Sequence, residues 1–183
     1  MSGEVLSTGL MLIKQPKVDL SSLSLSRIPN LLEGRFSNFH LTNNFATTES
    51  SFALGTNYEI QIRYKLTNFQ SYNALFWVHG SENNKHIGIQ IQNNAEHDYA
   101  LWIGIANSAN NGWVSSYADN AIPNDNEFHT LNLKRNNNRL TAMIDDVSVI
   151  DLNLDNVTTG TDAYRYSFGT NYSFTYDFDG WID

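Results

Sequence analysis

The residues best suited to chemistry lie between positions 94 and 125, in two neighbouring polar segments that also carry aromatic side chains. A flat aromatic ring can stack on the apolar face of a pyranose, while amides and carboxylates can bind its hydroxyl groups. Segment 107–125 and the turn before it supply both kinds of group. We expect a sugar-binding site made of six residues: Trp113, Tyr117, Asn110, Asn111, Asp98 and Tyr99.

Such a site predicts weak binding for a single copy of the protein. One stacked tryptophan contributes roughly 1–3 kcal/mol. A site with one ring and a few amides then has a dissociation constant on the order of mM to tens of µM. Useful attachment needs many copies presented together. Trp113 is equally compatible with a loop residue folded over the edge of a β-sandwich. Trp102 fits either the second face of a sheet or a groove.

The β-strands predicted from short alternating runs of residues must position this site. Tyr58, Ile60, Ile62 and Tyr64 alternate with polar residues, and the stretch 125–154 contains three more such runs separated by 136–138 and 145–146. Period-2 alternation indicates half-buried strands, and Asn and Asp favour the hairpin turns between them. No stretch has a convincing helical period. The pattern predicts an all-β, two-sheet antiparallel jelly-roll sandwich.

The domain organisation follows from a change in composition near residue 35. Residues 1–34 predict an N-terminal arm or linker with one candidate strand, and residues 35–183 predict the sandwich. The apolar run 74–79 predicts a buried strand in which Trp77 is a core residue. Segment 107–126 is expected to be a long loop.

Composition excludes several classes of function. The 183 residues carry a formal charge of −8 and no cysteine, so disulfide and thiolate chemistry are excluded. An acidic domain is a poor partner for nucleic acid, whose binding depends on neutralising phosphates. No run of apolar residues is long enough to span a bilayer, so membrane insertion is not expected.

Five motifs recur in the order of a known family: the strand 58–65, the pair Phe128-His129, the turn 135–139, the pair Asp145-Asp146 and the closing segment 178–183. Over roughly residues 36–183, they resemble the concanavalin A-like lectin/glucanase superfamily, and within it the laminin-G-like domains. Segment 36–59, FSNFHLTNNFATTESSFALGTNYE, looks like the opening of laminin-G-like modules in bacteriophage tail and baseplate proteins. The resemblance implies a jelly-roll fold with its first and last strands side by side.

The same resemblance raises the question of bound metal and of catalysis. Domains of this kind often hold Ca²⁺ near one rim, and Asp98, Asp119 and Asp125 are the candidate ligands, although solvated loop acids are the commoner case. Retaining glucanases of this fold place paired acids two residues apart on one strand. Here only Asp177 and Asp179 come near that spacing, and the histidines lack zinc-site spacing. We therefore do not expect an enzyme.

The sequence thus predicts a non-catalytic, lectin-like module of a phage tail, baseplate or fibre protein that binds host cell-surface polysaccharide. Its expected location is the virion or the extracellular space, with other virion proteins as partners. The alternative is a structural virion or assembly domain, such as a decoration or tail protein, without a sugar ligand. A glycoside hydrolase is the least supported hypothesis, because the sequence lacks the paired catalytic acids of such enzymes.

Overall fold

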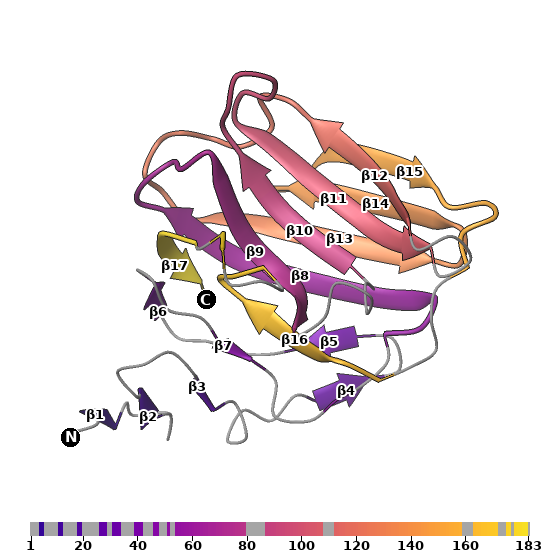
Figure 1. Ribbon diagram of the computed structural model, residues 1–183, viewed down its shortest axis with the longest axis horizontal. Coiled ribbons are helices and arrows are strands. Elements are labelled where there is room, and N and C mark those ends of the chain that lie inside the picture. The colour runs from indigo at the N-terminus through magenta and orange to yellow at the C-terminus, as the bar shows by residue number, and fades with distance from the viewer. Residues whose placement is uncertain are drawn as a thin grey trace.

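The computed structural model describes the backbone of short strands before residue 50 and, beyond them, residues 51, 54–79, 87–107, 112–158, 163–171, 175, 176 and 178–182. Two large β-sheets pack face to face in this part of the chain (Figure 1). The described residues contain no helix, and therefore none that could cross a membrane. The expected all-β, two-sheet architecture is confirmed.

The two sheets draw their strands from distant parts of the sequence. In spatial order, the seven-stranded sheet contains β12 (Gly112–Ala118), β11 (Ala100–Asn107), β10 (Ile87–Gln92), β9 (Tyr72–His79), β16 (Arg165–Phe168), β7 (Ala46–Thr47) and β3 (Val18–Asp19). The main path of the eight-stranded sheet contains β15 (Val147–Asn153), β14 (Arg139–Ile144), β13 (His129–Asn136), β8 (Asn57–Leu66), β17 (Gly180–Ile182) and β6 (Phe39–Leu41). β5 (Leu31–Glu33) joins it by pairing with β8 and with β4 (Ser26–Ile28), while β1 (Glu4–Val5) and β2 (Met11–Leu12) form a separate pair.

The pairings are antiparallel except where segments of the predicted arm join the sandwich. β3 runs parallel to β7, and β5 runs parallel to β8. Near the other end of the chain, β17 lies between β8 and β6. The opening and closing strands of segment 35–183 are therefore neighbours, as the resemblance implied.

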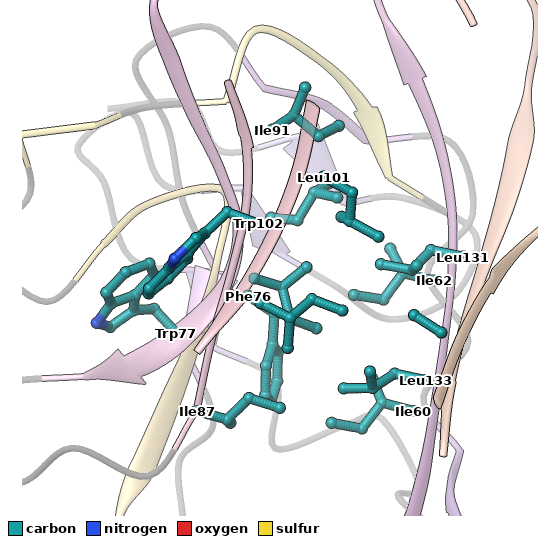
Figure 2. Close-up of a cluster of buried hydrophobic side chains, with 14 of the residues drawn as sticks. Ile60, Ile62, Phe76, Trp77, Ile87, Ile91, Leu101, Trp102, Leu131 and Leu133 are labelled. Atoms are coloured by element: carbon teal, nitrogen blue, oxygen red, sulfur yellow. The ribbon is translucent and has the colours of Figure 1, made fainter. Parts of the chain in front are cut away.

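The core fills the space between the sheets. β8 alternates buried and more exposed residues, so one of its faces packs inward. Figure 2 shows Ile60, Ile62, Leu131 and Leu133 facing the aliphatic side chains of the other sheet. β10 and β11 are buried on both faces along their whole length. A second layer of side chains therefore lies on the outer side of the seven-stranded sheet.

The two hairpin turns in 125–154 form where the sequence predicted them. β13 and β14 are joined at Asn137, with φ of 50°, and β14 and β15 are joined at Asp145 and Asp146, with φ of 47° and 67°. Positive φ matches the right-handed twist of hairpin strands, and Asn and Asp tolerate it better than most residues.

The expected long loop over 107–126 is wrong in its first part, because residues 112–118 form β12. This strand pairs with β11 along its whole length and is the edge of the seven-stranded sheet. It lies beside β15, the edge of the other sheet (Figure 1). Trp113, Ser115 and Tyr117 alternate with Val114 and Ser116, but two serines among these five residues made the period-2 signal weak.

Candidate functional site

One surface of the seven-stranded sheet carries Trp113 and Tyr117 together with further aromatic and amide side chains. We call the outward-facing side of β9–β12 the tryptophan face. Its members follow from the strand register and from alternation along each strand. They include Trp77, Gly88, Gln90, Gln92, Trp102, Gly104, Trp113, Ser115 and Tyr117.

Three tryptophans form the centre of this face. The Trp77 and Trp102 rings are stacked, with centroids 5.3 Å apart and an interplanar angle of 18°. The Trp113 ring packs against both, at 5.7 Å from Trp77 and 5.6 Å from Trp102. Trp77 and Trp102 are buried, while Trp113 is half-buried. Figure 2 shows Trp77 and Trp102 on the opposite side of the strands from the aliphatic core.

Two glycines beneath the rings make this packing feasible. Gly88 and Gly104 lie opposite each other on β10 and β11. A Cβ atom on Gly104 would lie 2.5 Å from the Trp102 ring, and one on Gly88 would lie 2.7 Å from the Trp77 ring. Real Cβ atoms do not approach that closely, so any side chain at either position would displace a tryptophan.

A line of amides crosses the same face along β10. Gln92 Nε2 donates to Gln90 Oε1 at 3.1 Å, and Asn94 Nδ2 donates to Gln92 Oε1 at 3.3 Å. Gln90 is buried, and its Nε2 has no hydrogen-bond partner among the described residues. A buried N–H₂ group without an acceptor costs roughly 1–3 kcal/mol. A ligand oxygen would remove that cost only after the overlying side chains had moved aside, because this nitrogen has almost no exposed surface.

At the end of the face, Tyr117 offers an exposed ring. It is 42% exposed, and its other side stacks on the imidazole of His97, with centroids 3.8 Å apart and planes inclined by 5°. His97 Nδ1 lies 3.0 Å from Asp119 Oδ1. The ring is therefore held in place from behind by the turn between β10 and β11.

The structure places the predicted site residues in four different situations. Trp113 and Tyr117 share the tryptophan face, four residues and roughly 13 Å apart along β12. Asp98 is exposed in the turn behind Tyr117, where its carbonyl accepts a hydrogen bond from Asn120 N at 2.8 Å. Asn110 and Asn111 lie outside the described residues.

The side chain of Tyr99 does not lie on the tryptophan face. Its ring packs edge-on against Phe69 at 4.8 Å, and its hydroxyl accepts a hydrogen bond from Asn124 Nδ2 at 3.1 Å. The ring belongs to the layer around the core. These contacts, together with a positive φ of 42°, give Tyr99 a clear structural role where β11 begins.

Sequence reasoning did not select Gln90 or Gln92, and it predicted Trp77 to be a core residue without assigning it to one face of the strand. Trp77 is buried as expected, but on the outer side of its sheet. The alternation Gly88, Gln90, Gln92 against Ile87, Ile89, Ile91 was the available signal, since small or amide residues on the second face of a buried strand leave space for large neighbours.

The candidate metal ligands are held by different partners. Asp119 pairs with His97, and Asp125 accepts a hydrogen bond from Glu127 N at 2.9 Å and lies 2.8 Å from His129 Nε2. Within the described residues, no three acidic, histidine or cysteine side chains gather as a metal site would require. A Ca²⁺ site at Asp98, Asp119 and Asp125 stays a prediction.

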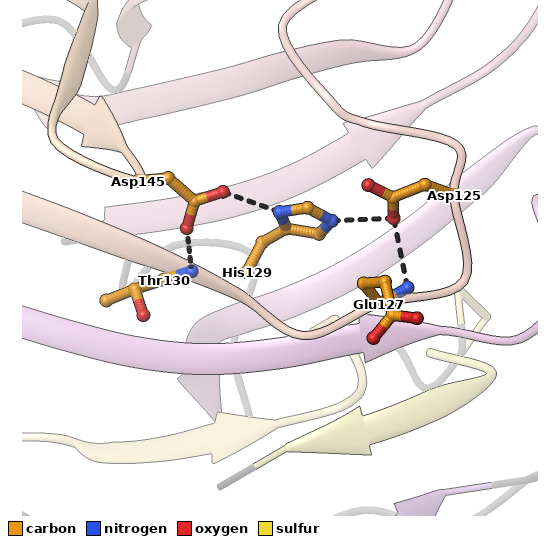
Figure 3. Close-up of polar contacts among 5 residues, drawn as sticks. All are labelled: Asp125, Glu127, His129, Thr130 and Asp145. Carbon is orange, nitrogen blue, oxygen red and sulfur yellow. Dashed lines mark hydrogen bonds and ion pairs between the residues drawn. The ribbon is translucent and has the colours of Figure 1, made fainter.

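A second polar cluster lies at the end of the eight-stranded sheet (Figure 3). Asp145 Oδ2 lies 2.5 Å from His129 Nδ1, while Asp125 Oδ1 occupies the other ring nitrogen. Asp145 Oδ1 also accepts a hydrogen bond from Thr130 N at 2.8 Å. With a carboxylate at each nitrogen, His129 has no free nitrogen to act as a base. The cluster ties the loop before β13 to the turn after β14.

The electrostatics of this cluster follow from its geometry. Burial by itself lowers the pKa of His129, but the hydrogen bonds and charges of Asp145 and Asp125 outweigh it and raise that pKa. The hydrogen bond from His129 holds the pKa of Asp125 below its usual value. Burial opposes the same effect at Asp145, yet the contacts with His129 and Thr130 lower its pKa as well.

A shallow hollow of about 490 Å³ lies on the other sheet, around the β13–β14 turn. Arg139 pairs with Asp151 there, and Asn138 and Asn153 both donate to Asp155. The lining is made of amide, carboxylate and guanidinium groups without an aromatic ring. It therefore lacks the stacking surface that the tryptophan face provides.

Comparison with known proteins supports the fold. No protein-family model matches the chain, and no curated protein matches it. A sialidase carbohydrate-binding module (CBM40) from Ruminococcus gnavus superposes with a TM-score of 0.61 at 14% identity, over 80% of this chain and 86% of that one. Laminin α1 domains LG4-5 from mouse superpose with a TM-score of 0.55 at 16% identity, over 79% of this chain and 38% of that one.

A pentraxin from Limulus polyphemus gives a TM-score of 0.57 at 8% identity, over 75% of this chain and 65% of that one. These similarities and the two-sheet topology show a jelly-roll fold like that of laminin-G domains and carbohydrate-binding modules. At such low identity they establish the fold and do not identify a ligand.

Proposed function

We propose that this domain is a non-catalytic carbohydrate-binding module whose ligand lies on the tryptophan face. One observation carries the proposal: an exposed aromatic ring, Tyr117, and a buried amide with an unpartnered donor, Gln90, occupy the same face of one sheet. Stacking and amide hydrogen bonds are the two contacts that a sugar needs. The R. gnavus module of similar fold has been determined with sialyllactose bound, which supports a sugar ligand for this chain.

The rigidity of the face favours binding over chemistry. Each described ring is positioned by a neighbour before any ligand arrives, so little side-chain entropy is lost on binding. Of the pair considered as catalytic acids, Asp177 lies outside the described residues, and Asp179 accepts a hydrogen bond from Thr67 Oγ1 at 3.0 Å. The preorganised rings therefore support a binding role for this surface.

We further propose that the module serves attachment to polysaccharide on a host cell surface, as part of a phage tail, baseplate or fibre. The opening segment 36–59 supports this through its resemblance to phage modules. Weak binding at a single aromatic site also suits a particle that presents many copies. The proposed location is accordingly the virion or the extracellular space, with other virion proteins as partners.

The test is binding of the fluorescently tagged domain, presented multivalently, to panels of intact bacteria with competition by purified wall polysaccharides. Tyr117→Ala is the diagnostic variant, because Tyr117 is exposed and its loss should leave the tryptophan cluster intact. Lys134→Ala, an exposed change on the other sheet, is the control. Strain-selective labelling that sugar competes away and that Tyr117→Ala abolishes is expected. Absence of labelling on every strain would favour the structural assembly role instead.

A further inference from the structure

The ring that this face exposes most is surrounded by acidic groups. We propose that the tryptophan face takes uncharged sugar units and rejects acidic ones; this rests on the sugar-binding function proposed above and deepens it. The ligand class would then differ from the sialyllactose bound by the R. gnavus module of similar fold.

The first argument is the position of Asp119. It follows Tyr117 by two residues, and its side chain is 53% exposed. Only Oδ1 is engaged by His97, at 3.0 Å, so Oδ2 is left at the edge of the aromatic platform. A carboxylate oxygen accepts hydrogen bonds from sugar hydroxyls but repels a sugar carboxylate.

The second argument is the acidic turn behind the ring. Glu96 and Asp98 flank His97 and are exposed. The hydrogen bond from Asn120 N to the carbonyl of Asp98 holds this turn against the residue that follows Asp119. Asp119 and the two acidic neighbours of His97 therefore lie on the side of Tyr117 on which His97 stacks. Charges within about 10 Å of each other still interact at physiological salt, so an acidic ligand would meet their combined field.

The third argument is the distance to a compensating cation. Among the described outward-facing residues of β9–β12 and β16, the cationic one is Arg165, which shares its side of β16 with Ser167, the register partner of Trp77. β16 lies four strands from β12, roughly 19 Å at the usual strand spacing. Arg165 is too far away to pair with a carboxylate on a sugar stacked at Tyr117. The chain as a whole carries a charge of −8, which adds to the repulsion.

The buried amides of β10 favour the same class of ligand, an uncharged sugar. Gln90 and Gln92 line the floor of the face with uncharged amides, which are hydrogen-bonded to each other and to Asn94. An amide donor binds a hydroxyl or an N-acetyl carbonyl without the desolvation cost that a buried charge would bring. Hydroxyl and acetamido groups of neutral sugars are therefore the groups that suit this uncharged floor.

The experiment is a binding comparison on the purified full chain, using arrays of neutral hexose and N-acetylhexosamine oligosaccharides, sialyllactose and chitosan oligosaccharides. We expect the best neutral probe to bind at least about tenfold more tightly than sialyllactose. Its affinity should also be nearly the same at about 0.05 M and about 0.5 M NaCl, because no ion pair is screened.

The diagnostic variant is Asp119→Asn, which keeps an oxygen acceptor for His97. It should lower the preference for neutral over sialylated probes several-fold. Asp151→Asn, an exposed carboxylate paired with Arg139 on the other sheet, should leave the preference unchanged. Selective binding of sialyllactose or of chitosan, or an unchanged preference in Asp119→Asn, would overturn the charge selectivity while sugar binding stands. Failure to bind any probe would overturn both.

Discussion

The two outer surfaces of this sandwich are built from different residues although the same aliphatic core lies beneath them. The eight-stranded sheet turns Glu59, Gln61, Asn132 and Lys134 to solvent, the ordinary polar face of a half-buried sheet. The seven-stranded sheet instead places tryptophans over two glycines, with buried glutamines beside them. A fold needs only one buried face per sheet, so the second apolar layer points to a role beyond stability.

The two sheets are also stabilised by different kinds of contact. Ring stacking and shape complementarity hold the tryptophan face. Hydrogen-bonded charges hold the end of the eight-stranded sheet, where His129 bridges two carboxylates. Mutations on the tryptophan face should therefore lower stability by disrupting packing. Mutations around His129 should instead change how stability depends on pH.

The largest effect is expected at Trp102, which contacts both of the other tryptophans in the cluster. Trp102→Ala should lower the free energy of unfolding by roughly 3–5 kcal/mol, because it leaves a cavity in a buried layer. Lys134→Ala on the other outer face should change it by less than about 0.5 kcal/mol. Urea denaturation measures both; equal losses would show that the two faces do not differ as described.

Gly104→Ala should have the second-largest effect on stability, because its Cβ would lie 2.5 Å from the ring of Trp102. Overpacking of this kind should cost roughly 1–3 kcal/mol and should shift the near-ultraviolet circular dichroism of the tryptophans. Ser148→Ala, a small exposed residue on the other sheet, serves as the control. A stable Gly104→Ala protein with an unchanged spectrum would mean that the rings do not rest on the strand.

His129→Gln should reveal the pH dependence of the eight-stranded sheet. A raised histidine pKa stabilises the fold at low pH and loses that contribution as pH rises through the folded value, whereas lowered aspartate pKa values stabilise above their unfolded values. The variant should therefore lose most stability, relative to the native protein, between about pH 4 and 6.5. Thermal melts across pH check this. A deficit that does not vary with pH would contradict the charged contact.

Arg139→Ala should have the smallest effect. Its two hydrogen bonds to Asp151 join two exposed side chains. Such pairs are screened by water and salt, and many contribute nothing measurable. Thermal melting at low and high salt should show no difference from the native protein. A clear loss of stability or of glycan binding would instead direct attention to the hollow beside Arg139.

The strands with clean alternation could be predicted from the sequence, because β8, β13 and β14 bury one face and solvate the other. The turns at Asn137 and Asp145 followed from residue chemistry. β12 was missed, since its serines blur the alternation. The tryptophan cluster was not predictable, because it depends on the register that places Trp77 opposite Gly88 and Gly88 opposite Gly104. Pairing between strands is a long-range property that local pattern does not contain.

The most direct test of the central claim uses the four tryptophans as internal reporters. Trp77, Trp102 and Trp113 lie on the tryptophan face, whereas Trp181 lies on β17 in the other sheet. Titration of ¹⁵N-labelled protein with the tightest-binding oligosaccharide should shift the indole N–H resonances of Trp102 and Trp113 and leave that of Trp181 unchanged. Saturable binding that shifts only Trp181, or none of the four, would place the ligand elsewhere and contradict the account.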